Sequence, residues 1–240
     1  VFIQVRGRGD ALYQSEIVPV SKKIKNNFDP LEYTLIVGKT LGLEIHAWVN
    51  TYLLWSSPYE PIDSDHLFHT KTEWMESNYY GKSDLKVYEQ KKKSSRWEGI
   101  YLSPLHPSVN DYLLKVFSEI INKYDVDGIH FDYIRYQDDY YGYNKVGRQN
   151  FQDVHNLDPI DIARGIISTR FGYQQSYVDS IKKIWENYKI NKIDSLLIQA
   201  RYILDNSEKK IELSAAVKPN LNDSKTRWSQ DWKSWIDNDL

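Results

Sequence analysis

The segment VDGIHFDYIRY, residues 126–136, begins like a buried strand and ends in polar and aromatic side chains. Successive side chains of a strand point to opposite faces, so His130 and Asp132 share one face. Ile129 and Phe131 share the other face, and their apolar side chains suit packing against helices. The sequence therefore predicts a strand with one covered face and one face that carries a histidine and a carboxylate near the strand's end.

The rest of the chain alternates short β-rich runs with helical periodicity. Strands are predicted at residues 1–6, 43–50, 126–136 and 210–220, and helices at 29–42, 107–125, 175–189 and 193–206, with a further helix opening at 230–240. Strands separated by helices imply a parallel sheet in an α/β fold. Two architectures fit this order, a doubly wound sheet and a (β/α)8 barrel.

The barrel is favoured because all four predicted strands acquire polar residues at their carboxyl ends, where barrel enzymes build their sites. RGRGD (6–10) lacks the glycine spacing of a dinucleotide fingerprint, which weakens nucleotide-binding interpretations. More than fifty residues separate Asn50 from the helix near 107, and long loops of this kind are usually functional. Within this loop we predict a basic surface stretch at 88–99 and a short extra strand in 99–109. Residues 1–240 are expected to form one barrel domain.

Three strands bring polar side chains to the same end of the predicted sheet. They are Gln4 and Arg6, with Asp10 in the following turn; His46, Trp48 and Asn50; and His130 with Asp132. Each has a structural explanation by itself: His130 as a hydrogen-bonded core residue, Asp132 as an acceptor for Arg6 or Arg135. Together they indicate a site.

Composition narrows the class of ligand. Hydrophobic residues make up 41% and charged residues 27%, and the net charge of −2 argues against a nucleic-acid partner. The chain has 19 Tyr and 8 Trp but only 7 Phe, and rings with a polar tip suit half-wet clefts that bind sugars. Filling of the core and surface is the alternative role of these rings.

Other chemistries find little support. The absence of cysteine excludes disulfides and thiolate sites, no G-x-S-x-G segment occurs, and no cofactor is expected. Asp63, Asp65 and His66 fit either a cation site or a solvated loop, and the loop is favoured, so no metal is predicted. The sequence contains no run of 18 or more apolar residues, so no transmembrane helix is predicted. VFIQVRGRG at the start lacks a signal-peptide layout and suggests that a segment precedes it.

Several segments, in order and spacing, resemble the bacterial glycosyl hydrolase-like family ten. The most specific of them are QVRGRGDALY, HAWVN and DGIHFDYIRY, and the resemblance spans almost the whole chain. It implies a (β/α)8 barrel of about 300 residues, of which this chain would hold the second to fifth strands, so the first strand and the last strands would be missing. It also implies an exported or lipid-anchored protein of the periplasm or cell surface. Members of known activity cleave glycosidic bonds, including those of peptidoglycan strands stripped of stem peptides.

The resemblance implies roles for individual residues. Asp132 matches the family's acidic residue at the end of the fourth strand and would be one of two catalytic carboxylates. Its partner is left open among Asp10, Asp138, Asp139, Asp231 and a strand outside this chain. Many members carry a second acidic residue where this chain has Tyr133, which leaves a tyrosine nucleophile as a further alternative.

The other predicted site residues would bind a polysaccharide substrate. They are Arg6, Asp10, His46, Asn50, His130, Arg135 and Asn220 for polar groups, Trp48, Tyr133 and Tyr136 for stacking, and His106 at the rim. The predicted function is a glycoside hydrolase acting on a bacterial cell-wall or cell-surface polysaccharide. A catalytically silent glycan-binding barrel is the main alternative, and a lyase or phosphate-ester hydrolase is a third. A second carboxylate roughly 5–9.5 Å from Asp132 would favour the hydrolase.

Overall fold

The computed structural model describes residues 1–90 and 97–240. Its main sheet has four strands, all parallel, in the order β1-β2-β5-β6. These are β1 (Phe2–Arg6), β2 (His46–Asn50), β5 (Gly128–Asp132) and β6 (Glu212–Ala215). A separate antiparallel pair joins β3 (Leu53–Trp55) to β4 (Ile100–Tyr101). The predicted α/β fold with a parallel sheet is confirmed, and β4 confirms the extra strand expected in 99–109.

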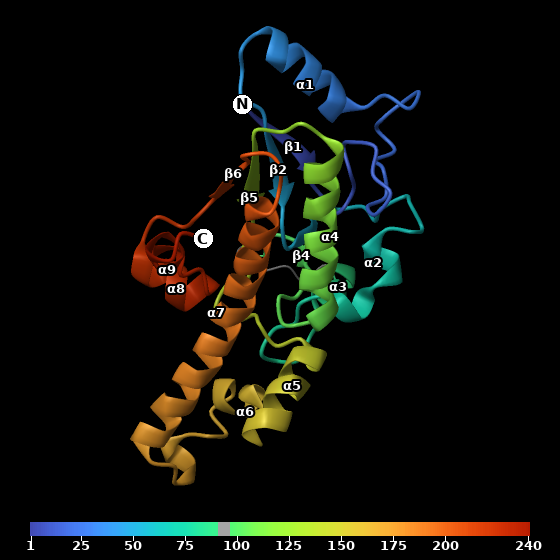
Figure 1. Ribbon diagram of the computed structural model, residues 1–240. Coiled ribbons are helices and arrows are strands. Elements are labelled where there is room, and N and C mark those ends of the chain that lie inside the picture. The colour runs from blue at the N-terminus through green and yellow to red at the C-terminus, as the bar shows by residue number, and fades with distance from the viewer. Residues whose placement is uncertain (91–96) are drawn as a thin grey trace.

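Helices fill the connections between the strands (Figure 1). They are α1 (Pro30–Thr40), α2 (Leu67–Thr70), α3 (Asp84–Glu89), α4 (Pro107–Lys123), α5 (Lys145–His155), α6 (Pro159–Ala163), α7 (Gln175–Asp205), α8 (Leu221–Trp228) and α9 (Trp232–Asp237), with 3-10 turns at Thr72–Trp74 and Thr169–Phe171. The predicted surface stretch 88–99 begins at the end of α3, and its residues 91–96 lie outside the described part of the chain.

Local sequence explains where α1 and α4 begin. Asp29 precedes α1, and its carboxylate accepts hydrogen bonds from the amides of Leu31 and Glu32, each at 3.0 Å. His106 precedes α4 in the same way, and its Nδ1 accepts from the amide of Ser108 at 3.3 Å. A proline follows each cap, in the helical position where its missing N–H costs nothing.

The two helices predicted at 175–189 and 193–206 are one helix, α7, of 31 residues. The prediction of a break was wrong because residues 190–192 contain neither glycine nor proline, so nothing there ends the hydrogen-bonded ladder. Ile190 and Ile193 are buried and continue the apolar stripe across the expected gap. Among the described helices, none is long and apolar enough to cross a membrane.

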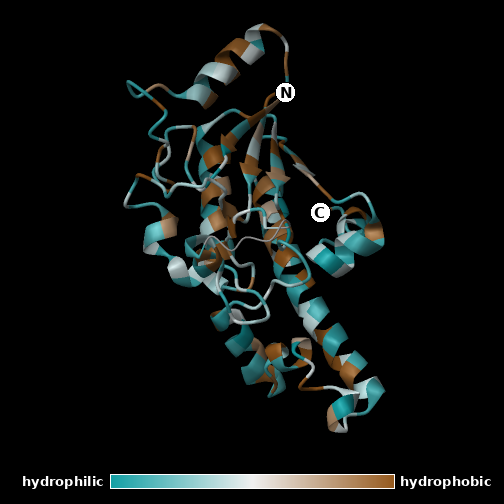
Figure 2. Cartoon of the chain, turned by 180° about the vertical axis from the view of Figure 1, so that it is seen from behind, coloured by the Kyte–Doolittle hydropathy of each residue, from teal (hydrophilic) through white to brown (hydrophobic). Residues whose placement is uncertain are grey.

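Helices α4 and α7 pack on one face of the sheet (Figure 1). Figure 2 shows the molecule from behind. Ile129 and Phe131 point toward these helices, and the Phe131 ring lies 4.4 Å, centroid to centroid, from the ring of Phe117 on α4. The predicted alternation in β5 is therefore confirmed. The covered face holds the apolar core and leaves the other face to the polar side chains.

The described strands form an open sheet, with β1 at one edge and β6 at the other. Four strands do not close a barrel, because a closed barrel of this type needs eight. The parallel sheet is thus observed, and the complete barrel stays a prediction from the family resemblance.

Close packing beneath the polar face depends on one glycine. Gly128 pairs with His46 on the adjacent strand, and a Cβ at Gly128 would lie 2.2 Å from His46 Nδ1. The His46 ring is buried and also packs against the ring of Phe2, with centroids 5.1 Å apart. Glycine at 128 therefore makes room for the imidazole.

We expect Gly128→Ala to destabilise the protein by about 1–3 kcal/mol, because the added methyl group must displace a packed ring. A decrease of several degrees in thermal midpoint, measured by circular dichroism, is the expected result. The double variant Gly128→Ala/His46→Ala should regain stability relative to the sum of the two single variants, because the clash is gone. A Gly128→Ala protein as stable as the wild type would contradict this account.

Candidate functional site

The uncovered face of the sheet carries a set of facing polar residues. Parallel pairing of β2 with β5 places Trp48 opposite His130 and Asn50 opposite Asp132. Ser214 on β6 is the next neighbour of His130. Because these positions follow one another along one face, the structure brings together the residues that the sequence predicted on β2 and β5.

His130 is held from three sides. Its Nδ1 lies 2.9 Å from the hydroxyl oxygen of Ser214, and its ring contacts those of Phe2 and Trp48 at centroid distances of 4.7 and 6.1 Å. Burial lowers the pKa of His130, and the nearby Asp132 carboxylate opposes this shift. The neutral imidazole is thereby favoured at neutral pH.

Trp48 presents a partly buried ring to the same face. Within the described chain its indole Nε1 is buried and has no hydrogen-bond partner. The part of the ring that is not buried is a flat apolar surface, of the kind on which the CH face of a sugar stacks.

Asn50 and Asp132 end the two strands side by side. Asn50 donates from Nδ2 to the carbonyl of Gly7 at 2.7 Å and accepts from Gln4 Nε2 at 3.3 Å, which fixes its amide. The Asp132 carboxylate is partly buried and accepts a hydrogen bond from the Tyr133 amide at 2.7 Å. The carboxylate therefore sits at the carboxyl end of the sheet, as predicted for a barrel site.

Tyr133 is the first residue after β5 and does not continue the alternation of the strand. The strand ends at Asp132, and Tyr133 adopts a left-handed conformation with φ of 52°. A bulky residue seldom adopts this conformation, and such strain is concentrated at functional sites. The turn carries the ring to within 6.2 Å of the Tyr101 ring and 5.2 Å of the Arg135 guanidinium. Burial raises the pKa of Tyr133, and the Asp132 charge adds to the rise.

Arg135 contacts residues that the sequence did not indicate as part of the site. Its Nη2 donates to both carboxylate oxygens of Glu98, at 3.1 and 2.9 Å. The Tyr101 hydroxyl donates to the same carboxylate. Lys218, just after β6, joins this group, because the charges of Glu98 and Asp132 both act on its ammonium. Burial nevertheless lowers the pKa of Lys218, followed by repulsion from Arg135. In the sequence, only the position of Glu98, an acidic residue just before β4, could have pointed to this group.

Arg6 and Tyr136 lie away from this face. A register irregularity in β1 pairs Arg6 with Val49 instead of Asn50, so the expected shared face with Gln4 is lost. The Arg6 guanidinium is fully buried and donates to the carbonyls of Asn50 and Thr51. Tyr136 is also buried, and its hydroxyl donates to the carbonyl of Lys189 at 3.4 Å. Arg6 Nε and Nη2 have no hydrogen-bond partner among the described residues, and ligand binding by Arg6 and by Tyr136 stays a prediction.

Three further predicted residues have local structural contacts. His106 caps α4 and packs on the Trp74 ring at 5.8 Å, and exposed Asn220 caps α8 by accepting from the Asp223 amide at 3.0 Å. Asp10, in the turn after β1, lies close enough to His66 for its charge to act on that ring. None has a contact with Asp132 or His130 that would tie it to the site.

The carboxylates considered as partners of Asp132 are engaged elsewhere or exposed. Asp138 is buried and accepts from the Tyr140 amide at 2.8 Å, and Asp139 is exposed. Asp231 pairs with Lys225 at 2.6 Å. In the loop that was considered for a cation, the Asp63 carboxylate pairs with the Lys22 ammonium at 2.9 Å. No cluster suited to a metal occurs in residues 1–90 or 97–240.

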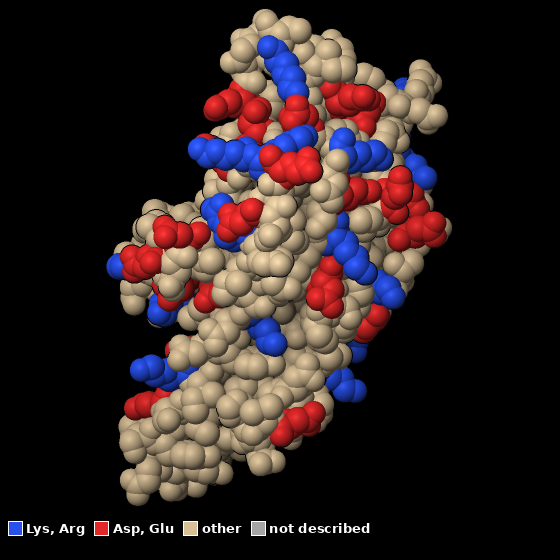
Figure 3. Space-filling model, viewed as in Figure 1, with Lys and Arg blue, Asp and Glu red and all other residues tan. Residues whose placement is uncertain are grey.

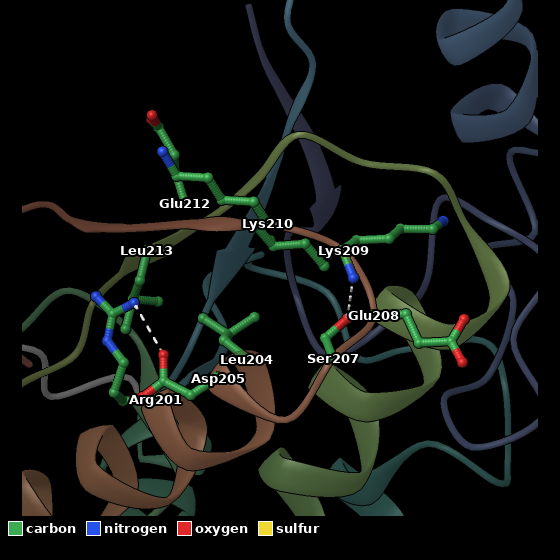
Figure 4. A pocket seen from close by; sticks show the side chains of 10 residues that line it. Arg201, Leu204, Asp205, Ser207, Glu208, Lys209, Lys210, Glu212 and Leu213 are labelled. Carbon is green, nitrogen blue, oxygen red and sulfur yellow. Dashed lines mark hydrogen bonds and ion pairs between the residues drawn. The ribbon is translucent and has the colours of Figure 1, made fainter.

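A groove of about 570 Å³ lies at the opposite end of the sheet, between the end of α7 and the start of β6 (Figure 4). Charged side chains such as Arg201 and Glu208 line it, and Arg201 pairs with Asp205 at 3.9 Å. It is separate from the polar face described above. Acidic and basic side chains are interspersed over the molecular face shown in Figure 3.

Comparison with known proteins identifies relatives that are named glycosyl hydrolases. Glycosyl hydrolase DigH of Escherichia coli K12 is 33% identical over 140 residues, which cover 55% of this chain and 30% of DigH. Glycosyl hydrolase YngK of Bacillus subtilis 168 is 25% identical over 161 residues, or 64% of this chain and 27% of YngK. The match thus spans less than a third of either relative.

Among solved structures, the PgaB (BpsB) glycoside hydrolase domain from Bordetella bronchiseptica superposes with a TM-score of 0.59, over 98% of this chain and 61% of that one. At 12% identity this likeness concerns the fold alone. The family described as glycosyl hydrolase-like 10 matches residues 1–240, the full length of the sequence. The expected family is therefore confirmed, and this chain belongs to the glycosyl hydrolase-like 10 family.

Proposed function

We propose that the protein is a glycoside hydrolase acting on a bacterial cell-wall or cell-surface polysaccharide, with Asp132 as one of its catalytic carboxylates. The observation that carries this proposal is the position of Asp132, at the carboxyl end of a parallel strand and beside the strained Tyr133. The family relationship supports the reaction class, and the glycosyl hydrolase relatives support a carbohydrate substrate. A completed (β/α)8 barrel would enclose the polar face as its lumen.

The residues around Asp132 fit the needs of a sugar ring. Trp48 offers a partly buried ring face, and Asn50 and His130 offer fixed polar groups beside it. A ring for stacking combined with a few oriented polar groups is the usual composition of a carbohydrate site. The substrate we propose is the glycan strand of peptidoglycan after removal of its stem peptides. This substrate places the reaction outside the cytoplasm, which fractionation of cells that produce the protein would check.

Asp132→Asn in the intact protein should decrease the rate of glycan cleavage about 10²–10⁴-fold, because the amide neither donates a proton nor acts as a base. Release of new reducing ends from amidase-treated peptidoglycan strands measures this rate. The variant should bind the strands with near wild-type affinity, since the amide is close in size and shape to the carboxylate. Undiminished cleavage by Asp132→Asn would remove Asp132 from the catalytic role. A wild-type protein that binds the strands without cleaving them would favour the glycan-binding alternative.

Trp48→Ala should increase KM several-fold, because stacking on an aromatic ring contributes on the order of 1 kcal/mol. Trp48→Phe keeps a ring but loses the indole donor and should show a smaller increase. Steady-state kinetics on the same strands, with thermal midpoints as a check of folding, distinguish the two variants. An unchanged KM in a well-folded Trp48→Ala protein would show that this ring does not contact the substrate.

A further inference from the structure

The carboxylate of Glu98 is held against the segment that leaves β5. Arg135, only three residues after Asp132, donates to both of its oxygens, and the Tyr101 hydroxyl donates as well. Arg135 is buried, so this ion pair is shielded from solvent on the arginine side. Within the described chain, Arg135 and Tyr101 both donate to the Glu98 side chain, as expected for partners of a carboxylate.

The backbone around Glu98 is also fixed. The Glu98 amide donates to Gln137 Oε1 at 2.8 Å. On either side, the indole of Trp97 and the amide of Tyr101 donate to the carboxylate of Asp84, at 3.1 and 3.0 Å. Asp84 is fully buried, and burial raises its pKa well above the usual range. Because these bonds hold the segment in place, Glu98 is positioned before any ligand arrives.

Glu98 and Asp132 act on the same neighbours. The charges of both raise the pKa of Tyr133, after the larger effect of burial. The charges of both also act on the ammonium of Lys218. The Tyr133 ring lies 6.2 Å from the Tyr101 ring and 5.2 Å from the Arg135 guanidinium, and both of these groups donate to the Glu98 carboxylate. Glycoside hydrolysis normally uses two carboxylates that flank the scissile bond of the substrate, and Glu98 is a second carboxylate fixed through a residue close to Asp132 in the chain.

We propose that Glu98 is the second catalytic carboxylate of this site and the partner of Asp132. The proposal rests on the proposed glycosidase function and makes it more specific. Arg135 and Tyr101 are then positioning residues, because they act through Glu98. Asp84 supports the same segment from below and has no direct part in the reaction.

The reaction that this pair performs is hydrolysis of a glycosidic bond. Asp132 passes its proton to the glycosidic oxygen as the bond from the anomeric carbon to that oxygen breaks. Glu98 either takes a proton from the water whose oxygen bonds to the anomeric carbon, or bonds to that carbon first and is released by water. In both routes one water is consumed, its hydroxyl ends on the anomeric carbon, and its remaining proton restores the carboxyl groups.

The test uses Glu98→Gln and Glu98→Ala in the intact protein, assayed on amidase-treated peptidoglycan strands by the release of reducing ends. Glu98→Gln keeps a hydrogen-bond acceptor for Arg135 and should lose activity at least about 100-fold. Glu98→Ala should be similarly inactive and should recover part of its activity in sodium azide or formate, because a small anion can replace the missing carboxylate. Glu208→Gln is the matched control, since Glu208 is exposed in the groove at the opposite end of the sheet (Figure 4). It should cleave at the wild-type rate.

The outcomes separate the two proposals. Near wild-type cleavage by both Glu98 variants, with Asp132→Asn inactive, would overturn the role of Glu98 and leave the proposed function standing. Loss of activity without azide or formate rescue, accompanied by a lower thermal midpoint, would show that Glu98 is structural and would also overturn the proposal. Absence of cleavage by the wild type and by Glu208→Gln would refute the proposed function on this substrate, and the inference about Glu98 with it.

Discussion

Parallel pairing of β2 with β5 places Trp48 opposite His130 and Asn50 opposite Asp132. At the start of the two strands, this register requires a glycine at position 128, because the His46 ring occupies the volume that a side chain there would need. A slip of one residue would turn every polar side chain of β5 toward the helices, and Ile129 and Phe131 toward the open face. The burial of Phe131 against Phe117 therefore also determines where Asp132 points.

The loops above the strands are held by buried carboxylates. Asp84 accepts from three groups around Glu98, and Glu76 accepts from the Ser103 hydroxyl and the amides of Ser77, Tyr143 and Asn144. Burial raises the pKa of both groups, and their hydrogen bonds oppose this effect. Satisfied polar networks of this kind make a loop rigid, whereas an unpaired buried carboxylate would be costly. The segments that these two carboxylates contact, after β2 and after β5, are thus fixed beside the sheet.

The sequence predicted the elements whose signals are local. Asp29 and Pro30 mark the start of α1, and strict alternation in β5 separates its two faces. The elements that it missed lack such signals or depend on distant contacts. Helices α5, α6 and α8 lie in polar stretches that resemble loops, and α7 continues through residues 190–192 because Ile190 and Ile193 are buried by the rest of the molecule. The irregular register that turns Arg6 away from Gln4 is a property of the β1–β2 pair and not of either strand by itself.

The sequence by itself determined the α/β class, the family, and the placement of His130 and Asp132 on one face of a strand, because periodicity and short motifs carry that information. Only the tertiary structure decided which polar residues meet at the end of that strand. It buried Arg6 and Tyr136, turned Tyr133 into a left-handed conformation, and joined Glu98 to Arg135, three residues after Asp132. Glu98 is 34 positions from Asp132 in the chain, and its approach depends on the β3–β4 pair, the buried Asp84 and the Arg135 ion pair. Contacts of such long range leave no pattern in the local sequence, since each partner by itself resembles an ordinary surface or loop residue.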